Sequence, residues 1–529
     1  MEKMAHFLSF KTPGKIRLKP EWFPVFLIIA FGFFLRIFKV RDYILFLGDE
    51  GRDALVVYGI LHGDLTLLGP TSSVGGFFLG PIYYYMMAPF MILSNFDPVG
   101  PAIMVVLFGL ATIYLVYRIG YEFFGRGAGL IASFLYAISP IVIAYSRSSW
   151  NPNVFPFFTI SSLYILYKAI SRNKLRLFVL AGILMGINLQ IHYLATFVGA
   201  IMFFYVLFST LSFRADTIAN LLKRYLSLFF GFLIGFSPFI AFELRHQFAN
   251  SQNIIRFIFN SEETGAGQLF FANIQHVFAR LFPGLIFSYP DFSKFSKFDP
   301  FILQLWLNLA IFIGLVSTIF FIIQFLKSVK TGNKKYEYSL IFAWMALGIG
   351  LFGLYNKSIY DYYLGFLFPV PFLLVGLLFS EITKILNKPG KVFVALALFG
   401  LFFLNLKFTP IAYLGNRQVD QVKMISHFIL SKTEGKPFNF ALITGGNSDH
   451  AYRYFMKLAG RDPVVIKGLD VDPQRKSATD QLFIVCETIP CYPLGYSLWE
   501  VAGFGRAEIV REWDVSVLKV YKLVHYEGE

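Results

Sequence analysis

A dense cluster of charge, Gly48-Asp49-Glu50-Gly51-Arg52-Asp53, follows the first long apolar run of the chain. Three carboxylates and one arginine within five residues at a membrane interface are costly unless they are paired or used. Asp49 or Glu50 could act as a general base on an acceptor hydroxyl or amine, and Arg52 could hold that base or meet a phosphate. Asp53 completes the candidate site. The cluster therefore predicts acid–base chemistry next to a bound anion.

The same residues also suit a structural role. The amphipathic stretch 54–61 follows directly, and Asp49 and Glu50 would then stand in the first turn of a helix, where carboxylates favour the helix dipole. Both interpretations stay open from the residues alone.

A second polar segment, residues 145–153, interrupts two apolar runs. Asn151 can exchange hydrogen bonds with sugar hydroxyls, Trp150 can stack on the face of a pyranose ring, and Arg147 adds a cation. The alternative is an Asn-Pro turn that only links two membrane spans. The segment is a candidate binding loop.

Further polar groups interrupt the apolar pattern at other places. A lone histidine is often only hydrogen-bonded structure, a Glu/Arg/His group is often salt-bridged at the interface, and a lone lysine is usually solvated. The functional alternative is that these groups bind substrate, with the lysine as a partner for phosphate. The candidates are Tyr83 and Tyr84, Gln190 and His192, Glu243, Arg245 and His246, and Lys357 and Tyr362.

The composition decides what kind of protein must position these groups. Of 529 residues, 56% are hydrophobic and only 15% are charged, too few to cover the surface of a soluble domain. The apolar residues come in runs of about twenty, the length of a helix that crosses the hydrocarbon. The Lys and Arg residues behind the net charge of +15 lie mostly in short loops between these runs, where such residues set the orientation of the spans in the membrane. This distribution argues against nucleic-acid binding.

There are about twelve apolar runs, and the positive-inside rule favours about eleven spans. If the run 77–96 is re-entrant, the N-terminus and the basic short loops are cytoplasmic. The first loop (about 42–98), a long loop (about 244–300) and the tail then lie outside. Arg36, Lys39 and Arg41 do not fit this assignment, because they lie at the outer end of the first span, where the positive-inside rule expects few basic residues. The basic loops predicted inside are 118–126, 168–176, 214–224, 327–335 and 384–391.

The tail from residue 411 to 529 changes character. Helical patterns (420–430, 450–458) alternate with strand-like runs (440–443, 482–485, 515–520), which predicts a small extracytoplasmic α/β domain behind the transmembrane domain 1–410. The tail holds Cys486 and Cys491, which could form a small-loop disulfide in an oxidising space or remain two free thiols.

At these residues the chain resembles the C-type (GT-C) polytopic membrane glycosyltransferases, in the branch of the aminoarabinose transferases and protein O-mannosyltransferases. The resemblance rests on Asp49-Glu50 after the first span and on Arg52 two residues later. Residues 78–85 look like the later first-loop motif, with Leu79 and Gly80 in place of its acid and lysine. Trp150-Asn151-Pro152 stands where relatives carry Asp-Pro, so a second carboxylate is missing.

The resemblance implies a GT-C fold and an inverting transfer on the extracytoplasmic side of the cell membrane. A sugar on a polyprenyl phosphate would be attacked by a protein, lipid or glycan acceptor, with Asp49 as general base and a cation stabilising the departing phosphate. No cofactor is certain, and a divalent metal is possible, although the missing carboxylate argues against an obligate one. The alternatives are a flippase or transporter of lipid-linked glycans and a polymerase or ligase of surface polysaccharide.

Overall fold

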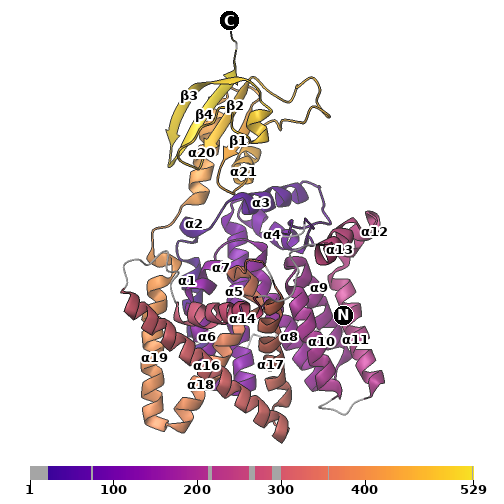
Figure 1. Cartoon of the computed structure of the whole chain (residues 1–529), viewed down its shortest axis with the longest axis vertical. Helices are drawn as coiled ribbons and strands as arrows, with labels where there is room; N and C mark the ends of the chain where they lie inside the picture. Colours follow the sequence, from indigo (N-terminus) through magenta and orange to yellow (C-terminus); the bar gives the residue numbers. More distant parts are fainter. Residues whose placement is uncertain are drawn as a thin grey trace, which may run out of the picture.

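The computed structural model describes residues 22–72, 76–211, 217–260, 269–288, 299–355, 357–526 and 528. The basic N-terminal tail, Gly75 and Arg214 therefore lie outside the described residues. A bundle of long helices forms one part of the molecule and a small sheet with its helices forms the other, as Figure 1 shows. Between them, α3 (Gly48–Leu61) lies across the end of the bundle.

The apolar runs of the sequence form most of the helices of the bundle. The early helices are α1 Phe23–Ile37, α2 Val40–Tyr43, α4 Ile82–Leu93, α5 Val99–Phe124, α6 Arg126–Ile138, α7 Pro140–Tyr145, α8 Phe155–Arg172, α9 Leu175–Ile191 and α10 Ala195–Leu211. The later ones are α11 Ile218–Gly235, α12 Ser237–Arg245, α13 Ala249–Asn260, α14 Phe270–Ala279, α15 Leu285–Phe287, α16 Pro300–Thr331, α17 Lys335–Gly350, α18 Pro369–Ile385 and α19 Asn387–Phe408.

Seven of the described helical segments are long and apolar enough to cross a membrane, and a bent pair, 361–367 with α18, makes an eighth. Five shorter apolar helices accompany them: α1, α4, α6, α9 and α10. The polytopic helical architecture is confirmed, whereas the number of about eleven spans stays a prediction.

Two segments differ from a simple alternation of spans and loops. With 12 residues and an internal Pro89, α4 extends about 18 Å, which is less than the hydrocarbon thickness. Residues 270–287, within the long loop expected at about 244–300, are helical, and the segment is long and apolar enough to cross a membrane. The pattern did not predict this helix because Asn273, His276 and Arg280 interrupt its apolar residues.

The C-terminal domain is a four-stranded sheet of order β1-β2-β4-β3, in which β1 and β2 are parallel and the other pairs are antiparallel. Its helix α21 packs against α3. The elements are α20 Gln418–Lys432, β1 Asn439–Ile443, α21 His450–Leu458, β2 Gln481–Cys486, α22 Trp499–Ala502, β3 Ala507–Val515 and β4 Leu518–His525.

The α/β character of this domain was predicted correctly, but the strand expected over residues 515–520 was wrong. Val515 ends β3 and Leu518 begins β4, and between them Ser516 has a φ of 59°, the left-handed conformation of a tight turn. The strand-like segment is therefore the turn of a hairpin. Cys486 and Cys491 form a disulfide bond that closes the loop after β2.

Candidate functional site

The acidic cluster forms the first turn of α3, which begins at Gly48. The Oε2 atom of Glu50 accepts a hydrogen bond of 3.0 Å from the backbone N–H of Leu47, and the Glu50 side chain is buried. Glu50 therefore has the structural role that the sequence allowed, because it satisfies an amide at the helix start. The Asp49 side chain, in contrast, is 52% exposed and remains open to a substrate.

Arg52 links the other two carboxylates of the cluster. One guanidinium nitrogen donates to Asp49 Oδ1 at 2.8 Å, and two others donate to Asp53 Oδ1 at 3.0 and 2.7 Å. Asp53 is completely buried, and Tyr84 of α4 lies against the pair. The arginine is thus anchored on a buried acid and holds the exposed one in a defined place.

A polar cavity of about 290 Å³ opens beside Asp49 and Arg52. Segments that are far apart in the sequence meet there: the start of α3, the loop before α4, the turn before α8, the loop that carries His192 and the short helix 361–367 that carries Tyr362. Its lining consists of Asp49, Arg52, Pro70, Thr71, Ser72, Leu79, Trp150, Asn151, Pro152, His192, Tyr193 and Tyr362.

Aromatic rings form one wall of this polar cavity. The Trp150 and Tyr362 ring centroids are 4.5 Å apart, and those of His192 and Tyr193 are 4.8 Å apart. Such faces can stack on the apolar side of a sugar ring. Asn151 is fixed because its Nδ2 donates to the carbonyl of Ile191 at 2.8 Å.

His192 is a neutral hydrogen-bond donor in this wall. Burial lowers its pKa to about 3. Its Nδ1 accepts from the backbone N–H of Leu194 at 3.1 Å, so the proton of the neutral ring is on Nε2. The ring can donate to a sugar or phosphate oxygen but carries no charge.

A second, apolar cavity of about 420 Å³ adjoins the polar one and shares Leu79 and Tyr193 with it. Lys357 is the one charged residue among the described residues that line it. The lining comprises Phe77, Phe78, Leu79, Gly80, Leu189, Tyr193, Leu194, Thr196, Phe197, Phe236, Phe239, Ser251, Ile254, Leu354, Tyr355 and Lys357.

The remaining sequence candidates lie elsewhere. Tyr83 is buried and pairs with the Ser149 hydroxyl at 2.8 Å, and the buried Arg147 donates to the carbonyls of Leu35 and Phe38. These bonds tie the loop after α7 to α4 and to the end of α1, and neither side chain lines the polar cavity.

Four other candidates lie on α9 and at the end of α12. Gln190 donates to the carbonyl of Gly235 at 2.6 Å, and buried Glu243 accepts from the backbone N–H of Ser251 at 2.8 Å. Arg245 and His246 are exposed at the end of α12 and line neither cavity.

Several lining residues were not predicted. Thr71 and Ser72 lie in an unremarkable polar stretch, and their position becomes apparent only because Thr71 forms a β-bridge with Phe78. Tyr193 could have been found, since it directly follows His192 in a segment already singled out. Across the described ranges no three His, Cys, Asp or Glu side chains come together as a potential metal site.

Burial makes the cluster sensitive to pH. It raises the pKa of Glu50 to about 7 and that of Asp53 to about 6. The folded protein therefore keeps protons that the unfolded chain has lost, and stability should fall as pH rises from about 4.5 to about 7. We expect Glu50→Gln to reduce this fall, measured by thermal unfolding of the purified protein across that range. Parallel curves for the variant and the wild type would contradict this role of Glu50.

Residues 79–242 match the family model of dolichyl-phosphate-mannose-protein mannosyltransferases, a match that begins after the acidic cluster. No curated protein matches the chain in sequence. The crystal structure of ArnT from Cupriavidus metallidurans bound to undecaprenyl phosphate is similar over 95% of this chain and 98% of that one, with a TM-score of 0.60 and 12% identity.

The archaeal oligosaccharyltransferase AglB from Archaeoglobus fulgidus, in complex with an inhibitory peptide and a dolichol-phosphate, is similar over 88% of this chain and 69% of that one. The TM-score is 0.53 at 15% identity. Both structures are GT-C glycosyltransferases. The chain is therefore a multi-pass membrane protein with the GT-C fold, as the resemblance of its sequence to that class predicted.

Proposed function

We propose that this protein transfers a sugar from a polyprenyl phosphate to an acceptor, and that the reaction takes place in the polar cavity beneath α3. One observation carries the proposal: a polar cavity with an exposed carboxylate adjoins an apolar cavity in whose described lining Lys357 is the one charged residue. A polyprenyl-phosphate sugar consists of an apolar chain, an anionic phosphate and a polar sugar ring in that order, which matches the order of the two cavities. ArnT and AglB, which share the fold, have been captured with polyprenyl phosphates.

In this proposal the prenyl chain enters the apolar cavity, whose walls are mainly Phe, Leu and Tyr side chains. The phosphate then lies near the junction of the two cavities. Lys357 in the lining of the apolar cavity and Arg52 in the lining of the polar one are the cations that can balance its charge. The sugar occupies the polar cavity, where Trp150 and Tyr362 offer ring faces and Asn151 and His192 offer hydrogen bonds.

The reaction needs a base and a stabilised leaving group. Asp49 removes the proton from an acceptor O–H or N–H as the acceptor atom forms a bond to the anomeric carbon. The acceptor attacks the face of this carbon opposite the phosphate, so the anomeric configuration is inverted. The bond between the carbon and the phosphate oxygen breaks, and the oxygen keeps the electron pair. The Arg52 guanidinium holds Asp49 in place and is near enough to the cavity to balance the phosphate charge. The proton on the half-exposed Asp49 then passes to solvent.

We infer that the site faces the extracytoplasmic side of the cell membrane. α3 and the C-terminal domain lie at the same end of the bundle (Figure 1), so both must face the same side of the membrane. The Cys486–Cys491 disulfide favours an oxidising space for that end. The positive-inside distribution, which leaves the N-terminus in the cytoplasm, supports the same orientation.

Binding of undecaprenyl phosphate to the purified protein tests the donor part of the proposal. Thr196 is exposed and lines the apolar cavity, so Thr196→Trp should fill it and weaken binding by about tenfold. Ala395 is also exposed and lines a different apolar hollow, so Ala395→Trp is the matched control and should bind like the wild type. Equal affinities for both variants, measured by native mass spectrometry, would place the prenyl chain elsewhere.

A further inference from the structure

The backbone of α3 makes direct contact with the C-terminal domain at two glycines of the acidic turn. A Cβ atom on Gly48 would lie 2.1 Å from Ser448 Oγ, and one on Gly51 would lie 2.3 Å from the backbone nitrogen of Ala451. Residues three apart lie on one face of a helix. Only glycine leaves room for the segment 447–451 to touch that face, and we call this contact the glycine seam.

Asn447 supplies the polar contact of the glycine seam. Its Oδ1 accepts a hydrogen bond of 2.7 Å from the backbone N–H of Gly48, one of the first-turn amides that have no partner within a helix. Its Nδ2 donates to Glu487 Oε2 at 3.4 Å. Glu487 is itself held by the hydroxyls of Thr444 and Tyr452, at 2.8 and 2.9 Å. The end of the sheet thereby fixes the start of α3.

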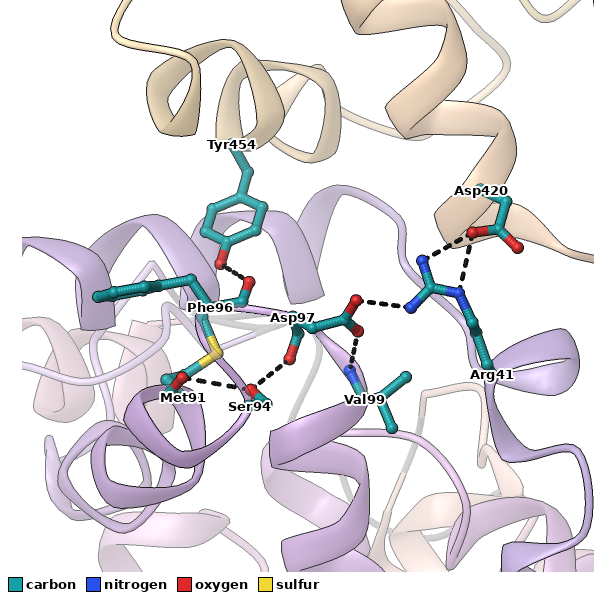
Figure 2. Close-up of polar contacts among 8 residues, drawn as sticks. All are labelled: Arg41, Met91, Ser94, Phe96, Asp97, Val99, Asp420 and Tyr454. Carbon is teal, nitrogen blue, oxygen red and sulfur yellow. Dashed lines mark hydrogen bonds and ion pairs between the residues drawn. The ribbon is translucent and has the colours of Figure 1, made fainter.

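A second contact anchors the domain away from this turn. Figure 2 shows Arg41 between two acids: it donates twice to Asp420 of α20, at 2.9 and 2.7 Å, and once to Asp97, at 2.6 Å. The Tyr454 hydroxyl donates to the carbonyl of Phe96 at 2.5 Å. Arg41, which the charge distribution left unexplained on the outer side, is thus part of the docking contact.

The glycine seam lies directly beside two residues of the candidate site. Asp49 lies between the two glycines and Arg52 directly follows them, so a shift of this turn moves both side chains relative to the polar cavity. His450 of the same segment is close enough for the charges of Asp49 and Arg52 to act on it. None of the residues that make the contacts in Figure 2 lines the polar cavity.

We infer that the C-terminal domain is part of the catalytic unit, with Asn447, braced by Glu487, as a positioning residue for Asp49. The inference rests on the proposed function for its catalytic consequence, but the positioning itself can be measured without turnover. The chain offers a rescue design, because exchanging acid and amide between positions 447 and 487 keeps the net charge and lets the pair hydrogen-bond again.

Hydrogen–deuterium exchange of the full-length protein in detergent tests the positioning. Asn447→Ala should speed exchange of the amides of residues 48–52 by about tenfold, since the Gly48 N–H loses its acceptor. The Asn447→Asp, Glu487→Gln double variant should exchange like the wild type. Asp420→Asn, the control at the second contact, should leave these amides unchanged. The inference is overturned if Asn447→Ala leaves exchange unaltered, or if Asp420→Asn raises it equally.

Turnover tests the catalytic consequence. With undecaprenyl-phosphate-linked sugars as donors, Asn447→Ala should lower kcat by about tenfold at unchanged donor KM, because a displaced base weakens the chemical step and not the lipid cavity. The double variant should restore kcat. Unrescued loss in the double variant would contradict the role of the pair. If the wild type turns over none of these donors, the proposed function fails, and the exchange measurement still decides whether Asn447 positions the turn.

Discussion

The Asp49→Asn variant should lose transfer activity by roughly 10²- to 10⁴-fold, the usual contribution of a general base. Asparagine has the same size and can still accept a hydrogen bond from Arg52, but it cannot take a proton from the acceptor. Affinity for undecaprenyl phosphate should be retained, because the apolar cavity does not include this residue. The measurement is the rate at which polyprenyl phosphate appears from a lipid-linked sugar.

The matched control is Asp64→Asn, which removes an exposed carboxylate that lies just after α3 and outside both cavities. It should keep wild-type activity. An Asp49→Asn variant that turns over at the rate of this control would remove Asp49 from the role of base.

The Arg52→Ala variant should lose both activity and stability. Asp53 is completely buried, and Arg52 is the cation that pairs with it. Leaving such a charge uncompensated costs about 3 to 5 kcal/mol of unfolding free energy. Asp49 also loses the partner that orients it.

A second substitution separates the two effects. The Arg52→Ala, Asp53→Asn double variant removes the buried charge, so it should recover much of the stability, measured by chemical denaturation in detergent, while activity stays low. Recovered activity in the double variant would show that Arg52 acts only through the stability of the fold. A single variant as stable as the wild type would contradict the pairing.

Periodicity and composition predicted the membrane bundle because each span must satisfy its own backbone in lipid, which forces long apolar runs. Periodicity did not predict a helix where polar residues interrupt the apolar pattern because they bond to other segments of the chain. Residues 270–287 read as a loop since Arg280 donates to the Ile359 carbonyl and to Asp361, contacts that no local pattern can show. The hairpin at Ser516 was missed because the strand-like pattern of residues 515–520 contains no glycine, proline or asparagine that would mark a turn.

The candidate site was partly predictable. Asp49, Arg52, Trp150, Asn151, His192 and Tyr362 were all named from the sequence and line one cavity. Glu243 and Gln190 were predicted as site residues for the same reason, because they are polar residues among apolar ones. Their hydrogen-bond partners are instead backbone groups of neighbouring helices. A single sequence does not reveal whether a polar group faces a cavity or a carbonyl. The contribution of Asn447 could not be predicted at all, since it depends on a contact across 399 residues.

The central claim is that the anomeric bond of a polyprenyl-phosphate sugar breaks in the polar cavity. The most direct measurement reconstitutes the purified protein in liposomes with a panel of such lipids and follows them by mass spectrometry. The account predicts that at least one donor is converted to free polyprenyl phosphate and a glycosylated acceptor by the wild type but not by Asp49→Asn. If every lipid-linked sugar stays intact while it moves between the two leaflets, the protein is a flippase and the account is contradicted.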